Sequence, residues 1–185
     1  MTIFKNKIPL FFWNTKVFHH LENHNYGDLL SLYIVKKISN KPVMFYNAPK
    51  KKRSFFKKRY LMAIGSILAH AQPKAVVWGS GIITKDQIVK KATFLAVRGP
   101  QTKKRLTGLG YDCPEIYGDP AILLPKYIKA SAKKYEIGII PHHKDFEIVK
   151  SLFKNRLDVK IIDLMTNDIE KTTLEIASCK KTISS

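Results

Sequence analysis

The sequence predicts an α/β fold built on a doubly wound parallel sheet. Short apolar runs alternate with amphipathic helical patterns from one end of the chain to the other, which is typical of such sheets. The 185 residues are 45% apolar and 11% aromatic, so the chain has enough apolar side chains for a core and lies outside the disordered class. Pattern and composition therefore favour the same fold class.

Each expected strand is a short apolar run that a turn or a helical pattern follows. The expected strands are residues 8–13, 42–46, 75–78, 94–97, 115–117, 136–141, 159–163 and 181–184. The expected helices are residues 28–38, 55–71, 100–109, 144–153 and 168–178.

A polar segment rich in Lys and Ala, at residues 125–134, interrupts this alternation, and we place a domain boundary there. The first domain is expected at residues 1–127 and the second at residues 135–185. The second would hold only about three strands and two helices, which leaves apolar faces and backbone groups of a sheet uncovered. We therefore expect the second domain to be truncated.

The chain is strongly basic, with 33 Lys and Arg against 14 Asp and Glu and a formal charge of +19. Such an excess attracts polyanions and anionic membrane surfaces. Residues 50–60 (KKKRSFFKKRY) concentrate it, either as a solvated basic loop running into a helix or as a contact with an acidic membrane. No zinc-finger, KH or RNP signature accompanies the charge, so nucleic acid is the weakest of these partners.

Two cysteines, Cys113 and Cys179, lack the paired spacing of a Cys-rich zinc site and suit a reducing compartment. The apolar run at residues 8–13 is too short for a signal-peptide core or a membrane span. We expect a cytoplasmic protein without a metal site.

The segment at residues 94–125 carries the strongest functional signal. An apolar strand delivers Arg98 to a Gly99-Pro100 break, after which a helix begins. Ligands of open α/β sheets bind at the carboxyl ends of strands, and a helix start together with a guanidinium suits an anion. The next short strand ends in Gly118-Asp119-Pro120, so Asp119 reaches the same edge if the two strands are parallel.

Two loops after other strands are ambiguous when each is taken alone. Asn25, Gly27 and Asp28 form either a capped helix start, with Asp28 as the N-cap, or a site for phosphate or sugar hydroxyls. The Gly79-Ser80-Gly81 loop is either a plain tight turn or an amide nest for an anion. Its spacing matches neither the dinucleotide fingerprint nor the P-loop, so NAD and ATP are not indicated.

His142 lies in a Pro-His-His-Lys-Asp stretch that follows the first strand of the second domain. One of its two histidines could serve as a general acid or base or contact a sugar hydroxyl, and the alternative is a histidine that only begins a helix. Adjacent histidines point in different directions, which disfavours a joint metal site.

The order of these motifs resembles that of the polysaccharide pyruvyl transferase family, and most closely its exopolysaccharide ketal-forming branch. The resemblance covers roughly residues 11–185 and rests on five motifs, namely NYGDLL at 25–30, VVWGSGI at 76–82, AVRGPQT at 96–102, YGDPAILLP at 117–125 and IGIIPHHKD at 137–145. It implies two Rossmann-like domains facing a cleft, as in B-type glycosyltransferases. It also implies transfer of the enolpyruvyl carbons of phosphoenolpyruvate onto two sugar hydroxyls, which forms a cyclic pyruvate ketal. No separate cofactor is expected, because phosphoenolpyruvate is itself the donor substrate.

This chemistry assigns expected roles to the residues. Arg98 and the Gly79-Ser80-Gly81 loop would hold the donor and stabilise the departing phosphate, with Asn25 and Gly27 as further substrate-binding residues. Asp28, Asp119 or His142 would take protons from the attacking hydroxyls. The general acid is not identified by any of these positions.

The resemblance also implies partners and a location. The acceptor would be a saccharide, expected to be lipid-linked, and the protein would lie in the cytoplasm as a peripheral protein at the inner membrane face. Family members continue after a strand such as residues 181–185 into a Ser-x-Leu-His-Gly motif, so we expect this chain to lack part of the site and to be inactive if it is naturally truncated.

Two other classes of function stay open from the sequence. A glycosyltransferase that uses a nucleotide sugar shares the two-domain architecture, although fold alone does not determine function. A non-catalytic protein that docks through its basic residues on a membrane or nucleic acid is the second alternative.

Overall fold

A computed structural model describes residues 7–47, 58–130 and 132–185 and divides the chain into two compact units. Met1–Asn14 and Leu30–Leu123 bound the first unit, and Thr15–Leu29 and Leu124–Ser185 bound the second. This grouping places Thr15–Leu29 with the carboxyl-terminal residues, which the sequence did not indicate. The domain limits proposed from the sequence stay a prediction.

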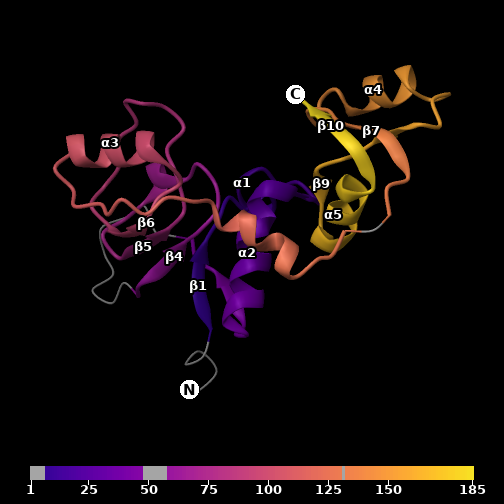
Figure 1. Cartoon of the computed structure of the whole chain (residues 1–185). Coiled ribbons are helices and arrows are strands. Elements are labelled where there is room, and N and C mark those ends of the chain that lie inside the picture. Colours follow the sequence, from indigo (N-terminus) through magenta and orange to yellow (C-terminus); the bar gives the residue numbers. More distant parts are fainter. Residues whose placement is uncertain (1–6, 48–57, 131) are drawn as a thin grey trace. The chain divides into compact units, whose positions relative to one another are not determined.

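The first unit contains a five-stranded sheet in which every pairing is parallel (Figure 1). Its strands are β1 (Ile8–Phe11), β3 (Val43–Phe45), β4 (Tyr60–Met62), β5 (Ala75–Trp78) and β6 (Thr93–Ala96). They lie in the order β3-β1-β4-β5-β6, so the strand order reverses between β1 and β4, as in the flavodoxin-like member of the doubly wound folds. The predicted α/β class is confirmed, and the sheet is Rossmann-like.

Helix α2 (Tyr26–Ser39) connects β1 to β3, and α3 (Pro100–Gly108) follows β6. The Ser31 hydroxyl of α2 accepts a 2.9 Å hydrogen bond from the backbone N–H of Ile64, just after β4. Leu106 anchors α3 as a fully buried side chain. Fully or almost fully buried apolar side chains from β1, α2, β4 and β5 form the core, namely Leu10, Phe11, Ile34, Val35, Met62 and Val77.

The helix predicted at residues 55–71 is wrong where the structure describes it. Residues 55–57 lie outside the described part of the chain, as does most of the basic cluster at 50–60. Within the remainder, β4 and a 3₁₀ turn at Leu68–His70 replace the helix. Tyr60 and Met62 are buried at alternate positions of β4, which pairs with β1 on one side and with β5 on the other. Gly65 has a φ of 104°, which an α-helix does not allow. A short apolar run between strands does not distinguish helix from strand by periodicity alone.

The second unit contains a three-stranded parallel sheet in the order β10-β7-β8. Its strands are β7 (Tyr135–Ile140), β8 (Val159–Ile161) and β10 (Cys179–Ser184), and its helices include α4 (Phe146–Leu152) and α5 (Ile169–Ala177). These elements match the predicted ones within a few residues. A short helix α1 (Thr15–Phe18) and an antiparallel pair, β2 (His24–Asn25) with β9 (Met165–Thr166), had no signal in the sequence.

Among the residues that the structure describes, no helix combines the length and the apolar character required to cross a membrane.

Candidate functional site

Arg98 lies at the carboxyl edge of the parallel sheet, two residues after β6 ends. Its Nη2 donates hydrogen bonds to Ser66 Oγ at 2.7 Å and to the Ile82 carbonyl at 3.0 Å. Ser66 follows β4 and Ile82 follows β5, so one side chain joins the loops after three adjacent strands. Both acceptors are neutral, and a guanidinium has five N–H donors. The side chain therefore keeps its positive charge and its remaining donors for a ligand.

Two glycines of the β5–β6 loop make room for this arrangement. At Gly81, a Cβ atom would lie 2.8 Å from Nε of Arg98. At Gly79, whose φ is 98°, a Cβ atom would lie 2.2 Å from Cδ of Pro120. Glycine is required here because a side chain would displace either the guanidinium or the turn at residues 118–120.

The backbone N–H groups of Gly79 and Gly81 do not form the anion-binding nest expected at residues 79–81, because both already donate to backbone carbonyls. The N–H of Gly79 donates to the Ala96 carbonyl at 2.9 Å, and that of Gly81 donates to the Gly65 carbonyl at 3.0 Å. Both bonds connect backbone segments of the first unit, so neither amide is available to an anion in this conformation. Contact of this loop with a substrate stays a prediction.

Ser80 lies between the two glycines and is fully buried. Its Oγ has no hydrogen-bond partner among the residues that the structure describes. A buried hydroxyl without a partner is unfavourable for folding, so this position departs from the usual pattern of satisfied polar groups.

A pocket of about 400 Å³ opens beside Arg98 and the amino terminus of α3. It is lined by Arg98, by the first residues of α3 and by the beginning of the β5–β6 loop, namely Gly99, Pro100, Gln101, Thr102, Ile82, Ile83, Thr84 and Lys85. Two cations and the positive end of a helix therefore face one cavity. Such a pocket suits a small anion.

Asp119 lies near this edge in a capping role. The strand expected at residues 115–117 is reduced to an isolated parallel bridge between Val97 and Tyr117, so this segment runs parallel to the end of β6 without forming a sheet strand. The Asp119 carboxylate accepts a 3.0 Å hydrogen bond from the N–H of Ala121, at the start of a 3₁₀ helix that spans Pro120–Lys126. A catalytic role for Asp119 stays a prediction.

Asn25, Gly27 and Asp28 gather at the start of α2, in the second unit. Asn25 Oδ1 accepts hydrogen bonds from the N–H of Gly27 at 2.9 Å and of Asp28 at 3.4 Å. Asn25 therefore caps the helix, and the sequence interpretation of Asp28 as the N-cap is wrong, because the helix begins at Tyr26. Burial raises the pKa of the Asp28 carboxyl to about 6, which is a suitable range for a group that exchanges protons near neutral pH.

His142 is exposed at the end of β7, also in the second unit. Its backbone N–H donates to Ser185 Oγ at 2.8 Å, and its ring centroid lies 4.1 Å from that of His143. Within the described ranges, no group of three His, Cys, Asp or Glu residues could hold a metal ion.

The residues predicted for the site thus fall into two groups, one in each unit. Gly79, Ser80, Gly81, Arg98 and Asp119 lie at one sheet edge of the first unit, whereas Asn25, Gly27, Asp28 and His142 belong to the second. Sequence reasoning missed Ser66, because Ser66 itself lay inside the helix expected at residues 55–71. The signal that could have identified it is Gly65-Ser66 directly after an apolar run.

A parallel α/β sheet that gathers an anchored arginine and a helix amino terminus at its carboxyl edge is typical of enzymes that bind anionic substrates. The family model of polysaccharide pyruvyl transferase matches residues 4–185, and the chain belongs to this family.

Comparison with curated proteins gives a viral relative. The uncharacterized protein L143 of Acanthamoeba polyphaga mimivirus is 28% identical over 177 residues, which cover 91% of this chain. The chain spans 60% of the length of that relative. No solved structure matches the chain.

Proposed function

We propose that the Arg98 pocket binds phosphoenolpyruvate and that the protein transfers its pyruvyl group as a ketal onto two hydroxyls of a saccharide. The observation that carries this proposal is the position of the Arg98 guanidinium. Two neutral oxygen atoms, Ser66 Oγ and the Ile82 carbonyl, hold it at the carboxyl ends of adjacent strands, and it lines a pocket at the amino terminus of α3. A phosphate and a carboxylate in one small molecule require such a concentration of positive charge.

The proposed reaction balances without a further reactant. Two acceptor hydroxyls add to the enolic carbon, the methylene carbon becomes a methyl group by gaining a proton, and the C–O bond to phosphate breaks. One hydroxyl proton balances the new methyl group and the other leaves with inorganic phosphate. Arg98 would stabilise the developing charge on the departing phosphate.

Asp28 is the proposed base for the acceptor hydroxyls. Its pKa of about 6 leaves the carboxylate mainly ionised at neutral pH yet basic enough to take part in proton transfer. His142 and Asp119 are the other proposed bases. Asn25 and Gly27 would contact the substrate at the start of α2.

The proposed setting is exopolysaccharide or cell-surface glycan biosynthesis. The acceptor would be a lipid-linked saccharide at the inner membrane face, with the two units forming the B-type architecture that the family resemblance implies. The formal charge of +19 supports attraction to an anionic lipid carrier and to the surrounding lipids.

Calorimetry with phosphoenolpyruvate tests the site. We expect Arg98→Ala to weaken binding by at least about tenfold, because charge-assisted hydrogen bonds to the anion disappear. Arg98→Lys should retain only part of the affinity, since an ammonium does not reproduce the bidentate fork. Arg156→Ala is the control, because Arg156 is exposed and bonded to Asp158 in the second unit. Equal affinity of the wild type and Arg98→Ala would refute the assigned site.

A further inference from the structure

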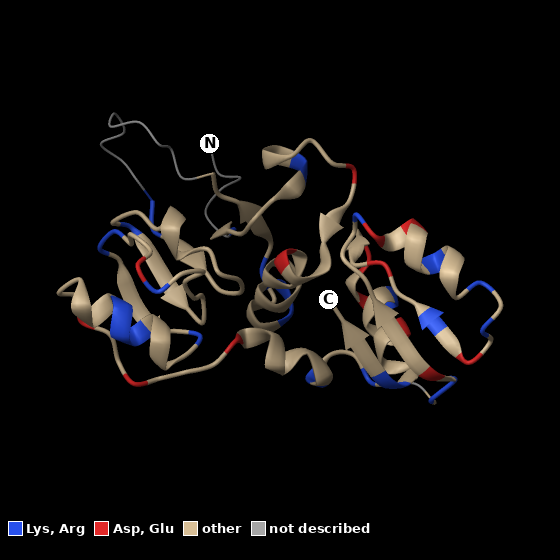
Figure 2. Ribbon diagram, turned by 90° about the horizontal axis from the view of Figure 1, so that it is seen from above, with Lys and Arg blue, Asp and Glu red and all other residues tan. Residues whose placement is uncertain are grey.

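A second, strongly basic pocket lies next to the Arg98 pocket in the same unit. It has a volume of about 310 Å³ and is lined by Lys85, Gln101, Lys104, Arg105 and Gly108. Lys85 and Gln101 line both pockets. Three of its five lining residues are cations, and none of the five is a carboxylate. Two of these cations, Lys104 and Arg105, belong to the basic stretch of α3 that is blue in Figure 2. An anion in this pocket would therefore lie beside a ligand held by Arg98.

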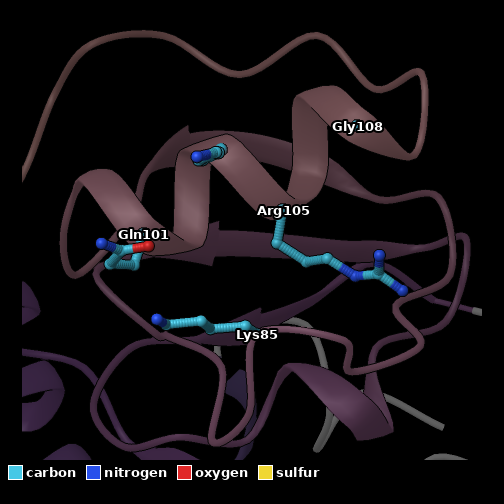
Figure 3. Close-up of a pocket in the computed structure, with 5 residues that line it drawn as sticks. Lys85, Gln101, Arg105 and Gly108 are labelled. Atoms are coloured by element: carbon cyan, nitrogen blue, oxygen red, sulfur yellow. The ribbon is translucent and has the colours of Figure 1, made fainter.

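Arg105 fixes the walls of this pocket. Its Nε donates to the Gln87 carbonyl and its Nη2 to the Asp86 carbonyl, each at 2.7 Å. In Figure 3 the Arg105 side chain extends from α3 towards the β5–β6 loop, which contains Asp86 and Gln87. The ammonium end of Lys85 is directed to the side where Gln101 lies. The two carbonyl bonds tie the loop that carries Lys85 to α3 without neutralising the guanidinium.

Of the three cations, Arg105 interacts with a nearby carboxylate, that of Asp86. The pKa of the exposed Asp86 carboxyl is lowered, chiefly by a hydrogen bond with the Thr84 side chain and to a smaller extent by the charge of Arg105. Lys103, one residue before Lys104, instead forms an ion pair with Glu115. Neither Lys85 nor Lys104 forms an ion pair with a residue that the structure describes. Lys85 and Lys104 are thus unpaired cations that line the same small cavity, and their like charges raise the positive potential there.

We propose that this pocket is a second anion site, which binds a phosphate or diphosphate group. The ligand chemistry is a phosphate oxyanion, because two ammonium groups, a guanidinium and an amide offer donors from two sides and the lining offers no carboxylate. Two sources supply such a group, namely the phosphate released from the donor and the diphosphate of a lipid-linked acceptor. This choice of sources rests on the proposed function, whereas the anion site itself does not.

The test is a titration of the ¹⁵N-labelled chain with inorganic pyrophosphate and, separately, with orthophosphate, at constant ionic strength. We expect saturable shifts of amides in α3 and in the loop at residues 84–88. Lys104→Gln should weaken binding by about fivefold. Lys104→Arg should retain binding, and Lys91→Gln, which removes an exposed charge of the same unit outside the pocket, should leave it unchanged.

The outcomes separate this site from the Arg98 site. Tighter binding of pyrophosphate supports the acceptor source, and tighter binding of orthophosphate supports the released phosphate. Absence of saturable binding by both anions, or equal weakening by Lys91→Gln and Lys104→Gln, overturns the second site. Arg98→Ala should weaken phosphoenolpyruvate binding by at least about tenfold and leave pyrophosphate binding intact. A wild-type protein that binds pyrophosphate but does not bind phosphoenolpyruvate would count against the proposed function alone.

Discussion

The Arg98 side chain shows how a charged group is positioned without being neutralised. Ser66 Oγ and the Ile82 carbonyl orient Nη2, and both are uncharged oxygen atoms. A carboxylate partner would orient the guanidinium as firmly but would repel an anionic ligand. The neighbouring Gly81 has no side chain that would displace the group.

Gly81→Ala tests whether this placement determines binding. Its new Cβ atom would lie 2.8 Å from Nε of Arg98, and we expect the flexible arginine to move away from its acceptors. Phosphoenolpyruvate affinity should fall by about tenfold, while the free energy of unfolding changes by less than about 1 kcal/mol. Calorimetry and urea unfolding measure the two quantities.

Gly108→Ala is the matched control, because nothing lies within 4 Å of a Cβ atom at that position and it does not line the Arg98 pocket. Unchanged phosphoenolpyruvate affinity in Gly81→Ala would show that Arg98 tolerates the displacement and is not held for binding.

At the scale of elements, the β5–β6 loop and the turn before Pro120 depend on each other. Gly79 adopts a φ of 98° and approaches the Pro120 ring, while its N–H donates to the Ala96 carbonyl of β6. The loop therefore joins β5, β6 and the segment that bridges to Val97.

Gly79→Ala should lower the free energy of unfolding by about 2–4 kcal/mol. The positive φ strains any residue with a side chain, and a Cβ atom 2.2 Å from Cδ of Pro120 forces the turn to move. Chemical denaturation followed by the fluorescence of Trp13 and Trp78, which both belong to the first unit, measures this loss. Gly99→Ala is the control, because its backbone is extended and nothing lies within 4 Å of the new atom. Equal stability of the two variants would contradict the packing argument.

Elements with a clear local pattern were predictable from the sequence, and those set by partners distant in sequence were not. Residues 75–78 and 100–109 were assigned well, because the first is a compact apolar run between a lysine and a glycine, and the second follows Gly99 and begins with Pro100. β2 has two residues and forms only by pairing with β9, more than a hundred residues away. No local window contains that information.

The residues of the candidate site also differ in how far their positions follow from local sequence. Arg98 was identifiable because a strand and a helix flank it in sequence. Ser66 and Lys85 reach the site from other loops, and only the folded sheet brings these loops together. The glycine amides of residues 79–81 could not be assigned from sequence, because their acceptors are carbonyls of other segments.

At the scale of the whole molecule, two compact units need not unfold together, so the stability of each is best measured separately. Asp28 offers a test for the second unit. Its folded pKa of about 6 exceeds the ordinary value of 3.8, so the folded state favours the protonated carboxyl. The stability that this group contributes is fully present below about pH 4 and is lost as the pH rises through about 6.

Asp28→Asn should therefore stabilise the second unit at pH 8 and make no difference near pH 4. The shift corresponds to at most about 3 kcal/mol, and solvent screening of this partly exposed group reduces the expected gain to about 1–2 kcal/mol. Amide exchange in β7 measures the effect within that unit.

Asp158→Asn provides a control of opposite sign. The hydrogen bond from Arg156 lowers the pKa of Asp158, so its stabilising contribution is present above its ordinary pKa and is lost in acid. Removing that carboxylate should lower stability at pH 8. Identical pH profiles for wild type and Asp28→Asn would mean that the Asp28 carboxyl is well solvated.

The route of the chain also limits how the protein can be dissected. It passes from one unit to the other after residue 14, returns within α2 after residue 29 and passes again after residue 123. A single cut near residue 127 would leave β2 on one fragment and its partner β9 on the other, and would separate the Tyr26 hydroxyl from Thr173, 2.7 Å away. Each unit becomes one continuous polypeptide only if residues 15–29 are transplanted to the carboxyl-terminal fragment and residues 14 and 30 are joined by a linker.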